Sequence, residues 1–301
     1  MKFRQSSSTT SASSEALILL ALVSFLWAGN YIVLKIAALE IPASTLVTAR
    51  LFVAAIALWI WLTLSGGEMP RLGRCFWRHV LIALLGQVIP FLILSSVAAR
   101  SKVGDVAVLI ATTPLFAALA SHIARKKWPG MGVTFSLAIG FVGICGFMGL
   151  AAAGGNQKWD ADAALLLAAL SYAISARVAA SLPDQNPIAT SAVVTSFGIL
   201  MLLPLCLGMD QPWLMTPSRQ ALASVLLLGC LSTAIAYVAY YRLISVSGPT
   251  FASLHHYLVP PLSIGFAALS FGEAVSLSQV LYGALVLASV ALSCRMIARG
   301  M

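Results

Sequence analysis

The chain has 301 residues, of which 60% are hydrophobic and 9% are charged. Soluble domains carry about 25% charged residues, so this composition excludes a water-soluble globular protein and favours a polytopic membrane protein made of helices. The formal net charge of +9 is typical of Lys and Arg gathered in cytoplasmic loops; no zinc-ligand spacing or basic low-complexity arm indicates a nucleic-acid partner, and we expect none.

Apolar segments fill the chain from residue 16 onward. Residues 1–15 are basic and then rich in serine, which predicts a disordered cytoplasmic tail. A transmembrane helix needs about 20 mostly apolar residues. The sequence predicts ten spans, at residues 16–38, 43–65, 76–98, 103–125, 131–151, 161–182, 187–208, 219–244, 249–271 and 277–297. The connections are short and marked by Gly, Pro, Asn and Asp, so no separate soluble domain is expected.

The two halves of the chain can be laid over each other. Trp27 falls on Tyr172 and Pro114 falls on Pro260, with the order and spacing kept along both halves. The predicted repeats are residues 16–151 and 158–297. Five spans is an odd number, so the second repeat enters the membrane from the opposite side. Inverted repeats are typical of secondary transporters, which bind substrate near the bilayer midplane between the halves.

The basic residues predict the orientation of the chain in the membrane. Lys and Arg concentrate on one side if the N-terminus is cytoplasmic. That side holds Lys2, Arg4, Arg71, Arg74, Arg78, Arg125, Lys126, Lys127, Arg242, Arg295 and Arg299, and the other holds Arg100, Lys102, Lys158 and Arg219. We therefore expect a multi-pass protein of the cell inner (plasma) membrane with both termini in the cytoplasm.

Several short motifs, in order, resemble a known family. They are "WAGNYIVLK" (27–35), "ARLFVAAIAL" (49–58), "IGFVGICG" (139–146), "FGE" (271–273) and "YGALVLASV" (282–290), with a central proline in each half. From about residue 16 onward the chain resembles the drug/metabolite transporter superfamily, in its ten-span EamA branch. The resemblance implies a central cavity enclosed by eight spans, with spans five and ten at the periphery. It also implies transport of a small metabolite. The substrates of the family belong to many chemical classes, and export of amino acids is common among its members. The first repeat has "ARKK" (124–127) where family members often have a Gly-Glu pair, a departure that bears on the substrate.

Polar and aromatic residues inside the spans are the candidate substrate-binding residues. Trp27, Asn30 and Tyr31 are spaced i, i+3 and i+4 and share one helix face. An Asn in hydrocarbon needs a partner, so this face should point inward, although Asn30 could instead join helices. Arg50 lies within the second span, and we favour a role in attracting a carboxylate over snorkelling or pairing with Glu40. Further candidates are Gln87, Tyr172 and Tyr237, whereas Tyr241 is expected at the cytoplasmic interface.

The stretch "LHHYLVPPLS" (254–263) places titratable groups and helix breakers inside a predicted span. His255 and His256 are adjacent, so they should point about 100° apart and cannot both face one pocket squarely. Two histidines without a third ligand are poor evidence for a metal, and no chain of carboxylates leads to them for a proton relay. We expect a pocket role for one histidine or for Tyr257; the alternative is a histidine packed between helices. Helix bends are expected at Pro90, Pro114, Pro260 and Pro261.

A stripe of glycines predicts close helix packing. Gly140, Gly143, Gly146 and Gly149 recur every third residue, and span ten carries small residues that suit it as the partner. The five cysteines are scattered in or beside apolar runs, so we expect no disulfide, no metal and no cofactor. No carboxylate lies at mid-membrane, which disfavours proton-coupled export of organic cations.

The sequence thus predicts an all-α polytopic membrane protein that exports small metabolites by alternating access, with amino acids, including aromatic or hydrophobic ones, as the preferred cargo. An anionic sugar or nucleotide-linked cargo is the alternative within transport, and a non-transporting sensor or assembly subunit is the alternative outside it. We find no HExxH motif, no paired intramembrane aspartates and no Ser/His dyad, so an enzyme is not expected. The expected partners are a small-molecule substrate and the lipid bilayer, with the protein a monomer or weak homo-oligomer.

Overall fold

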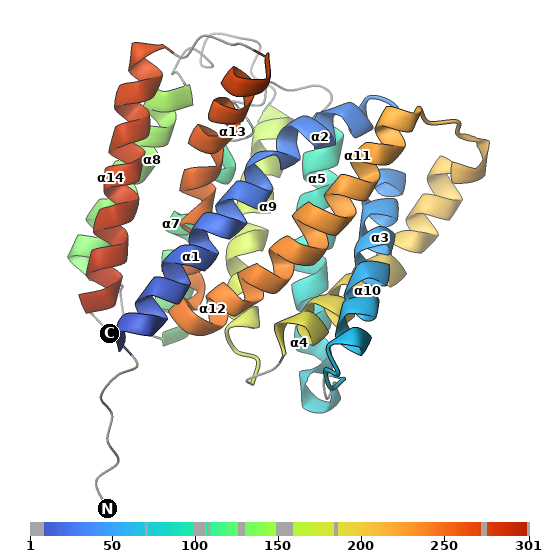
Figure 1. Ribbon diagram of the computed structural model, residues 1–301, viewed down its shortest axis with the longest axis horizontal. Coiled ribbons are helices and arrows are strands. Elements are labelled where there is room, and N and C mark those ends of the chain that lie inside the picture. Colours follow the sequence, from blue (N-terminus) through green and yellow to red (C-terminus); the bar gives the residue numbers. More distant parts are fainter. Residues whose placement is uncertain are drawn as a thin grey trace, which may run out of the picture.

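The computed structural model describes residues 9–69, 72–98, 106, 109–125, 130–148, 159–183, 186–271 and 276–299. Within these ranges the regular structure is helical throughout, with no strand. The helices pack together in one bundle. Helix α14 ends close to the point where α1 begins (Figure 1).

The helices of the first half are interrupted at two places. Its elements are α1 (Thr9–Ala28), α2 (Asn30–Ala38), α3 (Ala43–Leu64), η1 (Gly73–Cys75), α4 (Phe76–Ala83), η2 (Leu84–Val88), α5 (Ile89–Ala98), α7 (Thr113–Arg125) and α8 (Met131–Met148). Gly29 separates α1 from α2, and the Ala28 carbonyl at this break accepts the Ser263 hydroxyl at 2.7 Å. A π-helical turn, η2, separates α4 from α5.

The second half has a similar construction. Its elements are α9 (Trp159–Ala179), α10 (Pro187–Leu205), η4 (Cys206–Asp210), η5 (Pro212–Leu214), α11 (Arg219–Gly229), η6 (Cys230–Ile235), α12 (Ala236–Ala252), α13 (His255–Phe271) and α14 (Leu277–Arg299). The π-helical η6 interrupts predicted span eight as η2 interrupts span three, so corresponding spans of the two halves carry the same uncommon turn.

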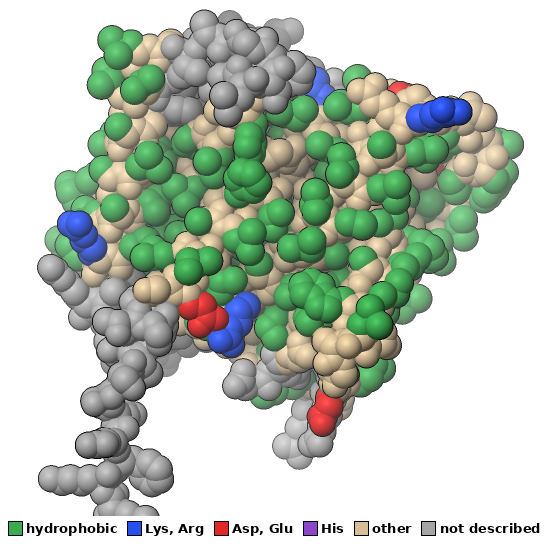
Figure 2. Space-filling model, viewed as in Figure 1, with side chains coloured by type: hydrophobic (Ala, Val, Ile, Leu, Met, Phe, Trp, Pro, Cys, Tyr) green, Lys and Arg blue, Asp and Glu red, His purple; other side chains and the backbone are tan. Residues whose placement is uncertain are grey.

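The outer surface of the bundle is apolar, as a membrane requires. Six helical stretches are long and apolar enough to cross a bilayer: Ser14–Ala38, Ala43–Leu64, Phe76–Val97, Asp160–Ala179, Pro187–Asp210 and Arg219–Ala252. Shorter apolar helices cover Thr113–Ile123, Met131–Gly146 and Val280–Met296, and α13 occupies most of predicted span nine. Figure 2 shows hydrophobic side chains over most of one face, with charged groups toward its upper and lower parts. Large apolar side chains such as Ile18 and Leu281 stay more than 60% exposed, which only lipid can cover favourably.

Helix pairing shows the two-repeat architecture directly. Span one packs on span eight (α1 on α12), and span three packs on span six (α4 and α5 on α9). Span four packs on span six (α7 on α9), and span nine packs on span one (α13 on α1). When each span is replaced by its counterpart five spans away, the contact of spans one and eight becomes that of spans six and three. In the same way, the contact of spans four and six becomes that of spans nine and one. Spans two and seven (α3 with α10) and spans five and ten (α8 with α14) pair with each other, the latter at one edge of the bundle (Figure 1).

Several boundaries differ from the sequence-based predictions. Helix α1 begins at Thr9 rather than at residue 16, and residues 1–8 of the predicted tail lie outside the described ranges. Helical structure in span eight runs to Ala252, broken at Gly248, whose φ of 81° is accessible to glycine without steric penalty. Of the predicted bends, Pro260 and Pro261 lie inside α13, and Pro90 lies just after η2 inside the continuous helical stretch Phe76–Val97. Pro114 takes the second position of α7, where a missing N–H is tolerated.

Candidate functional site

A cavity lies between the two halves, at the level of the π-helical turns. The empty space inside its lining amounts to about 630 Å³, a figure that includes the opening. Its lining comes from both repeats: Trp27, Asn30, Tyr31, Arg50, Gly86, Phe91, Leu94, Ile110, Tyr172, Ser175, Tyr237, Tyr240, Tyr241, His255, His256 and Val259. The structure therefore brings eight of the ten candidate residues to one space. Gln87 and Tyr257 are the two it places elsewhere.

Arg50 is the one Lys, Arg, Asp or Glu side chain among these lining residues. It is 3% exposed, and its Nε donates to the Thr233 hydroxyl at 2.6 Å while Nη2 lies 3.4 Å from the Ser232 carbonyl. The guanidinium carbon stands 4.0 Å from the centroid of the Phe91 ring, a cation–π arrangement. In the part of the chain that the structure describes, no carboxylate forms an ion pair with Arg50. The cavity wall therefore carries a buried positive charge without a counter-charge among the described residues.

The π-helical turns supply backbone carbonyls that bind aromatic residues of the cavity lining. In η6 the Ser232 carbonyl accepts the Trp27 indole N–H at 2.7 Å. In η2 the Gly86 carbonyl accepts the Tyr237 hydroxyl at 2.6 Å. Pro90, four residues after Gly86, has no N–H with which to complete an ordinary α-helical bond to that carbonyl. Interruption of the helices thus frees acceptors, and these fix two aromatic side chains of the other repeat.

Gln87 helps to join helices instead of lining the cavity, which corrects the prediction for this residue. It is fully buried, and its Nε2 donates to the Thr195 hydroxyl at 3.2 Å. Thr195 follows Arg50 by 145 residues and Thr233 follows Gln87 by 146, close to the 145 that separate Trp27 and Tyr172. The Arg50–Thr233 and Gln87–Thr195 bonds are therefore symmetry-related, and the cation belongs to one half only.

Both adjacent histidines line the cavity, contrary to the expectation that one would turn away. They begin α13, and their ring centroids are 3.9 Å apart. His255 also lies 4.5 Å from Trp27 and 5.3 Å from Tyr240, and His256 lies 5.5 Å from Tyr172, centroid to centroid. Flexible χ angles let two side chains separated by about 100° at the backbone converge, and the surrounding aromatic rings hold them there.

Tyr257 faces away from the cavity, which corrects the second prediction. Its side chain is fully buried and its hydroxyl donates to the Leu137 carbonyl of α8 at 2.7 Å. Tyr241, which was assigned to the membrane interface, is instead a lining residue that is only 7% exposed. The spacing of Tyr237, Tyr240 and Tyr241 is the same i, i+3, i+4 pattern as that of Trp27, Asn30 and Tyr31. That pattern was the signal that would have placed Tyr241 inside.

The glycine stripe of α8 faces α14. A Cβ atom added at Gly140 would meet Ser289 and Tyr257, one at Gly143 would meet Val286, and one at Gly146 would meet the Tyr282 ring. Gly149 lies outside the described residues. The described glycines therefore allow α14 to approach α8 with large side chains, not only with the small ones that the sequence suggested as partners.

Polar contacts also join the repeats at both ends of the bundle. At one end, Glu40 accepts from the backbone N–H and the hydroxyl of Ser218, both at 2.7 Å. These bonds hold the pKa of the Glu40 carboxyl below its ordinary value. Near the same end, Asp210 accepts from the Ser44 hydroxyl and from the backbone N–H of Thr45, the latter at 2.9 Å.

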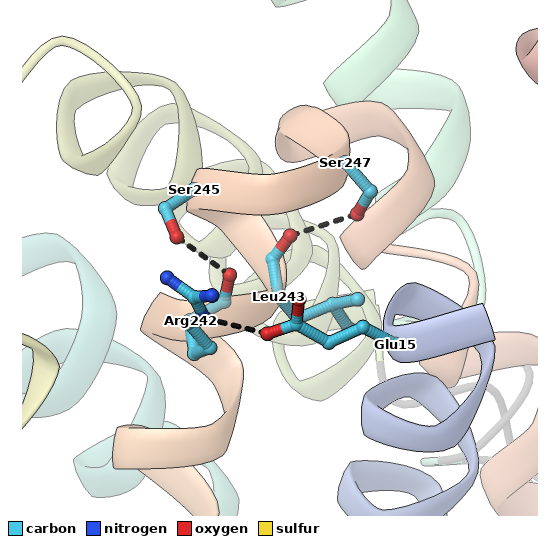
Figure 3. Close-up of polar contacts among 5 residues, drawn as sticks. All are labelled: Glu15, Arg242, Leu243, Ser245 and Ser247. Carbon is cyan, nitrogen blue, oxygen red and sulfur yellow. Dashed lines mark hydrogen bonds and ion pairs between the residues drawn. The ribbon is translucent and has the colours of Figure 1, made fainter. Parts of the chain in front are cut away.

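At the other end, Arg242 of α12 pairs with Glu15 of α1. Nε lies 2.7 Å from the carboxylate, and Figure 3 shows the pair beside the Ser245 and Ser247 hydroxyls, which bond to carbonyls of their own helix. Within the described ranges, no group of three His, Cys, Asp or Glu side chains is placed to hold a metal ion.

Comparison with known proteins agrees with this architecture. The model of the EamA-like transporter family matches twice, at residues 14–149 and 160–295. A solved crystal structure superimposes with a TM-score of 0.73 at 16% identity, covering 95% of this chain and 98% of its own, which shows a common fold.

Two curated relatives are similar over most of their length. The uncharacterized transporter YoaV of Bacillus subtilis is 24% identical, over 88% of this chain and 91% of its own. A probable terminal-alkyne amino-acid exporter of Streptantibioticus cattleyicolor is 26% identical, over 93% of each. With both halves matched, the chain is a helical membrane protein that belongs to the EamA-like transporter family, within the drug/metabolite transporter superfamily.

Proposed function

We propose that this protein exports amino acids with apolar or aromatic side chains across the cell inner (plasma) membrane by alternating access, with both termini in the cytoplasm. The observation that carries the proposal is the buried Arg50 guanidinium, which faces an aromatic cavity and has no ion-pair partner among the described residues. A carboxylate is the group that a planar guanidinium binds best. The name of one relative, an amino-acid exporter, adds support.

The surroundings of Arg50 favour an apolar or aromatic side chain on the cargo. Trp27, Tyr172, Tyr237 and Tyr240 all contribute rings to the cavity, and aromatic walls with a few fixed polar groups suit an amphipathic small molecule. A sugar phosphate or nucleotide-linked cargo carries more negative charge and calls for more than one cation. The described lining offers one, which supports amino acids over this alternative.

Flux through purified protein in liposomes tests the proposal. Vesicles loaded with unlabelled phenylalanine or leucine should accumulate the external labelled amino acid by counterflow, and vesicles without protein should not. A thermal-shift screen over amino acids, sugar phosphates and nucleotides should show stabilisation by the amino acids. Binding without counterflow would favour a sensor, and flux of sugar phosphates alone would reverse the assignment of cargo.

A further inference from the structure

Three buried polar atoms of the cavity lining have no hydrogen-bond partner within the described structure. They are Asn30 Oδ1, His255 Nε2 and the Tyr241 hydroxyl. The residues are 8%, 1% and 7% exposed, respectively. Buried polar groups are nearly always bonded in native proteins. These three residues share one cavity lining, so a single bound molecule can complete their hydrogen bonds.

The hydrogen bond at Nδ1 determines whether the Nε2 atom of His255 is a donor or an acceptor. Nδ1 lies 2.7 Å from the Ala252 carbonyl, which can only accept, so Nδ1 must carry the proton. His255 has no ion pair with a carboxylate among the described residues, and a buried charge without a partner is strongly unfavourable. The ring is therefore neutral, and Nε2 presents a lone pair to the cavity as a hydrogen-bond acceptor.

Asn30 supplies a second acceptor nearby. Its side-chain oxygen is the orphaned atom, and an amide oxygen can only accept. Asn30 begins α2 one turn after Trp27, whose ring is 4.5 Å from that of His255. The ring of Tyr240 lies 5.3 Å from both Trp27 and His255. Both acceptors therefore line a cavity whose wall also carries the Trp27 and Tyr240 rings, and the faces of such rings attract cations.

We propose that these residues form an ammonium site: Asn30 Oδ1 and His255 Nε2 accept hydrogen bonds from the amino group of a zwitterionic cargo whose carboxylate binds Arg50. The site rests on the proposed function and deepens it, because it selects free α-amino acids over carboxylic acids that lack the amine. A carboxylate alone would neutralise Arg50 but leave both acceptors unpaired, and a site built to bond an N–H group rejects analogues without it.

Analogues of the cargo test the site in the unmodified protein. Counterflow of labelled phenylalanine in proteoliposomes is measured against unlabelled phenylalanine, phenylpropanoate, which lacks the amine, and phenethylamine, which lacks the carboxylate. Leucine and 4-methylpentanoate form a second set. Phenylpropanoate should compete at least about tenfold more weakly than phenylalanine, as expected from the loss of hydrogen bonds to a charged group. Equal competition by the two would overturn the ammonium site while leaving a carboxylate transporter standing. Failure of all labelled amino acids to exchange would instead overturn the proposed function, and the site with it.

Variants assign the selectivity to the two residues. Asn30→Leu keeps a branched side chain without polar atoms, and His255→Phe keeps an aromatic ring in the stack. Each should weaken competition by phenylalanine about tenfold and leave competition by phenylpropanoate unchanged. His79→Phe is the matched control, because His79 is fully buried, has the same type of bond from Nδ1 to a backbone carbonyl, and does not line the cavity. It should keep the wild-type ratio. If phenylalanine and phenylpropanoate weaken together in the cavity variants, the residues only support the fold and the proposal is wrong.

Discussion

The proposed role of Arg50 in binding a carboxylate can be weighed against its contribution to folding. Both groups that it contacts by hydrogen bonds have other partners: the Ser232 carbonyl accepts from Trp27, and the Thr233 hydroxyl donates to the Leu228 carbonyl at 2.8 Å. Removing the guanidinium therefore orphans neither group. A buried cation without an ion-pair partner among the described residues is unfavourable for folding, and the proposed cargo carboxylate would supply the negative charge.

The Arg50→Met variant should separate these two effects. Methionine keeps an unbranched apolar stem, so the thermal unfolding midpoint of the purified protein should stay the same or rise. Amino acid counterflow should fall by at least about tenfold, because the charge that binds the carboxylate is gone. Thermal shift and proteoliposome flux on the same preparation make the comparison. A variant that melts far below the wild type would show that Arg50 holds the fold together.

Trp27 combines a hydrogen bond with a place in the cavity wall. Trp27→Phe removes the indole N–H that binds Ser232 and should lower the free energy of unfolding by about 0.5–1.5 kcal/mol, with a loss of flux. Trp59→Phe is the control, because Trp59 donates to the Ser196 hydroxyl at 3.1 Å between α3 and α10 and does not line the cavity. It should lose similar stability and keep transport. Equal loss of flux in both variants would contradict a role for Trp27 in the cargo site.

Among the elements, the pair α8 and α14 depends on glycine more visibly than any other described pair. A side chain at Gly146 would run into the Tyr282 ring, and one at Gly143 would meet Val286 within 2.9 Å. The helices are therefore as close as their backbones and side chains permit. This pair stands at one edge of the bundle and contributes no residue to the cavity lining (Figure 1).

Gly146→Val should consequently destabilise the protein by about 1–3 kcal/mol through overpacking, measured as thermal or denaturant unfolding in detergent. Gly265→Ala in α13 is the matched control, because an added Cβ there has no atom within 4 Å. It should be neutral or stabilise by up to about 1 kcal/mol, since alanine loses less entropy than glycine in a helix. Unchanged stability in Gly146→Val would show that α14 can move away without penalty.

For the whole molecule, polar contacts at the two ends of the bundle tie one repeat to the other. Glu40 and Asp210 each meet the N-terminal end of a helix in the opposite half, at Ser218 before α11 and at Thr45 in α3. A carboxylate is favoured there by the helix dipole and by free backbone N–H groups. Glu15 and Arg242 join the repeats at the opposite end. Under the proposed alternating access, the contacts at one end would break as the repeats move against each other.

The Glu40 contact should give the protein a measurable pH dependence. Hydrogen bonds from the Ser218 backbone and hydroxyl lower the pKa of Glu40 below its ordinary value of 4.5. A lowered folded-state pKa means that the stabilisation is present above that ordinary value and is lost as the pH falls through the lowered one. The difference in unfolding midpoint between wild type and Glu40→Ala should therefore be largest near neutral pH and shrink as the solution is acidified below about pH 4. A difference that stays constant with pH would contradict this contact.

Composition and periodicity determined much of this protein. Sparse charge and long apolar segments require lipid as the surrounding solvent, which predicts a helical membrane protein, and the alignment of Trp27 with Tyr172 predicts the two repeats. The helical period placed Trp27, Asn30 and Tyr31 on one face, and burial of an amide required that face to point inward. These inferences hold because they depend on local geometry and on desolvation, both of which can be read along the chain.

The tertiary structure alone decided which way the other candidates face. Gln87 turns to Thr195 and Tyr257 turns to α8, whereas both adjacent histidines reach the cavity. The sequence shows which residues share a side of a helix, but the rotation of that helix about its axis is set by packing against its neighbours. The same holds for the π-helical turns: their freed carbonyls gain partners, at Trp27 and Tyr237, only when residues distant in the chain come together.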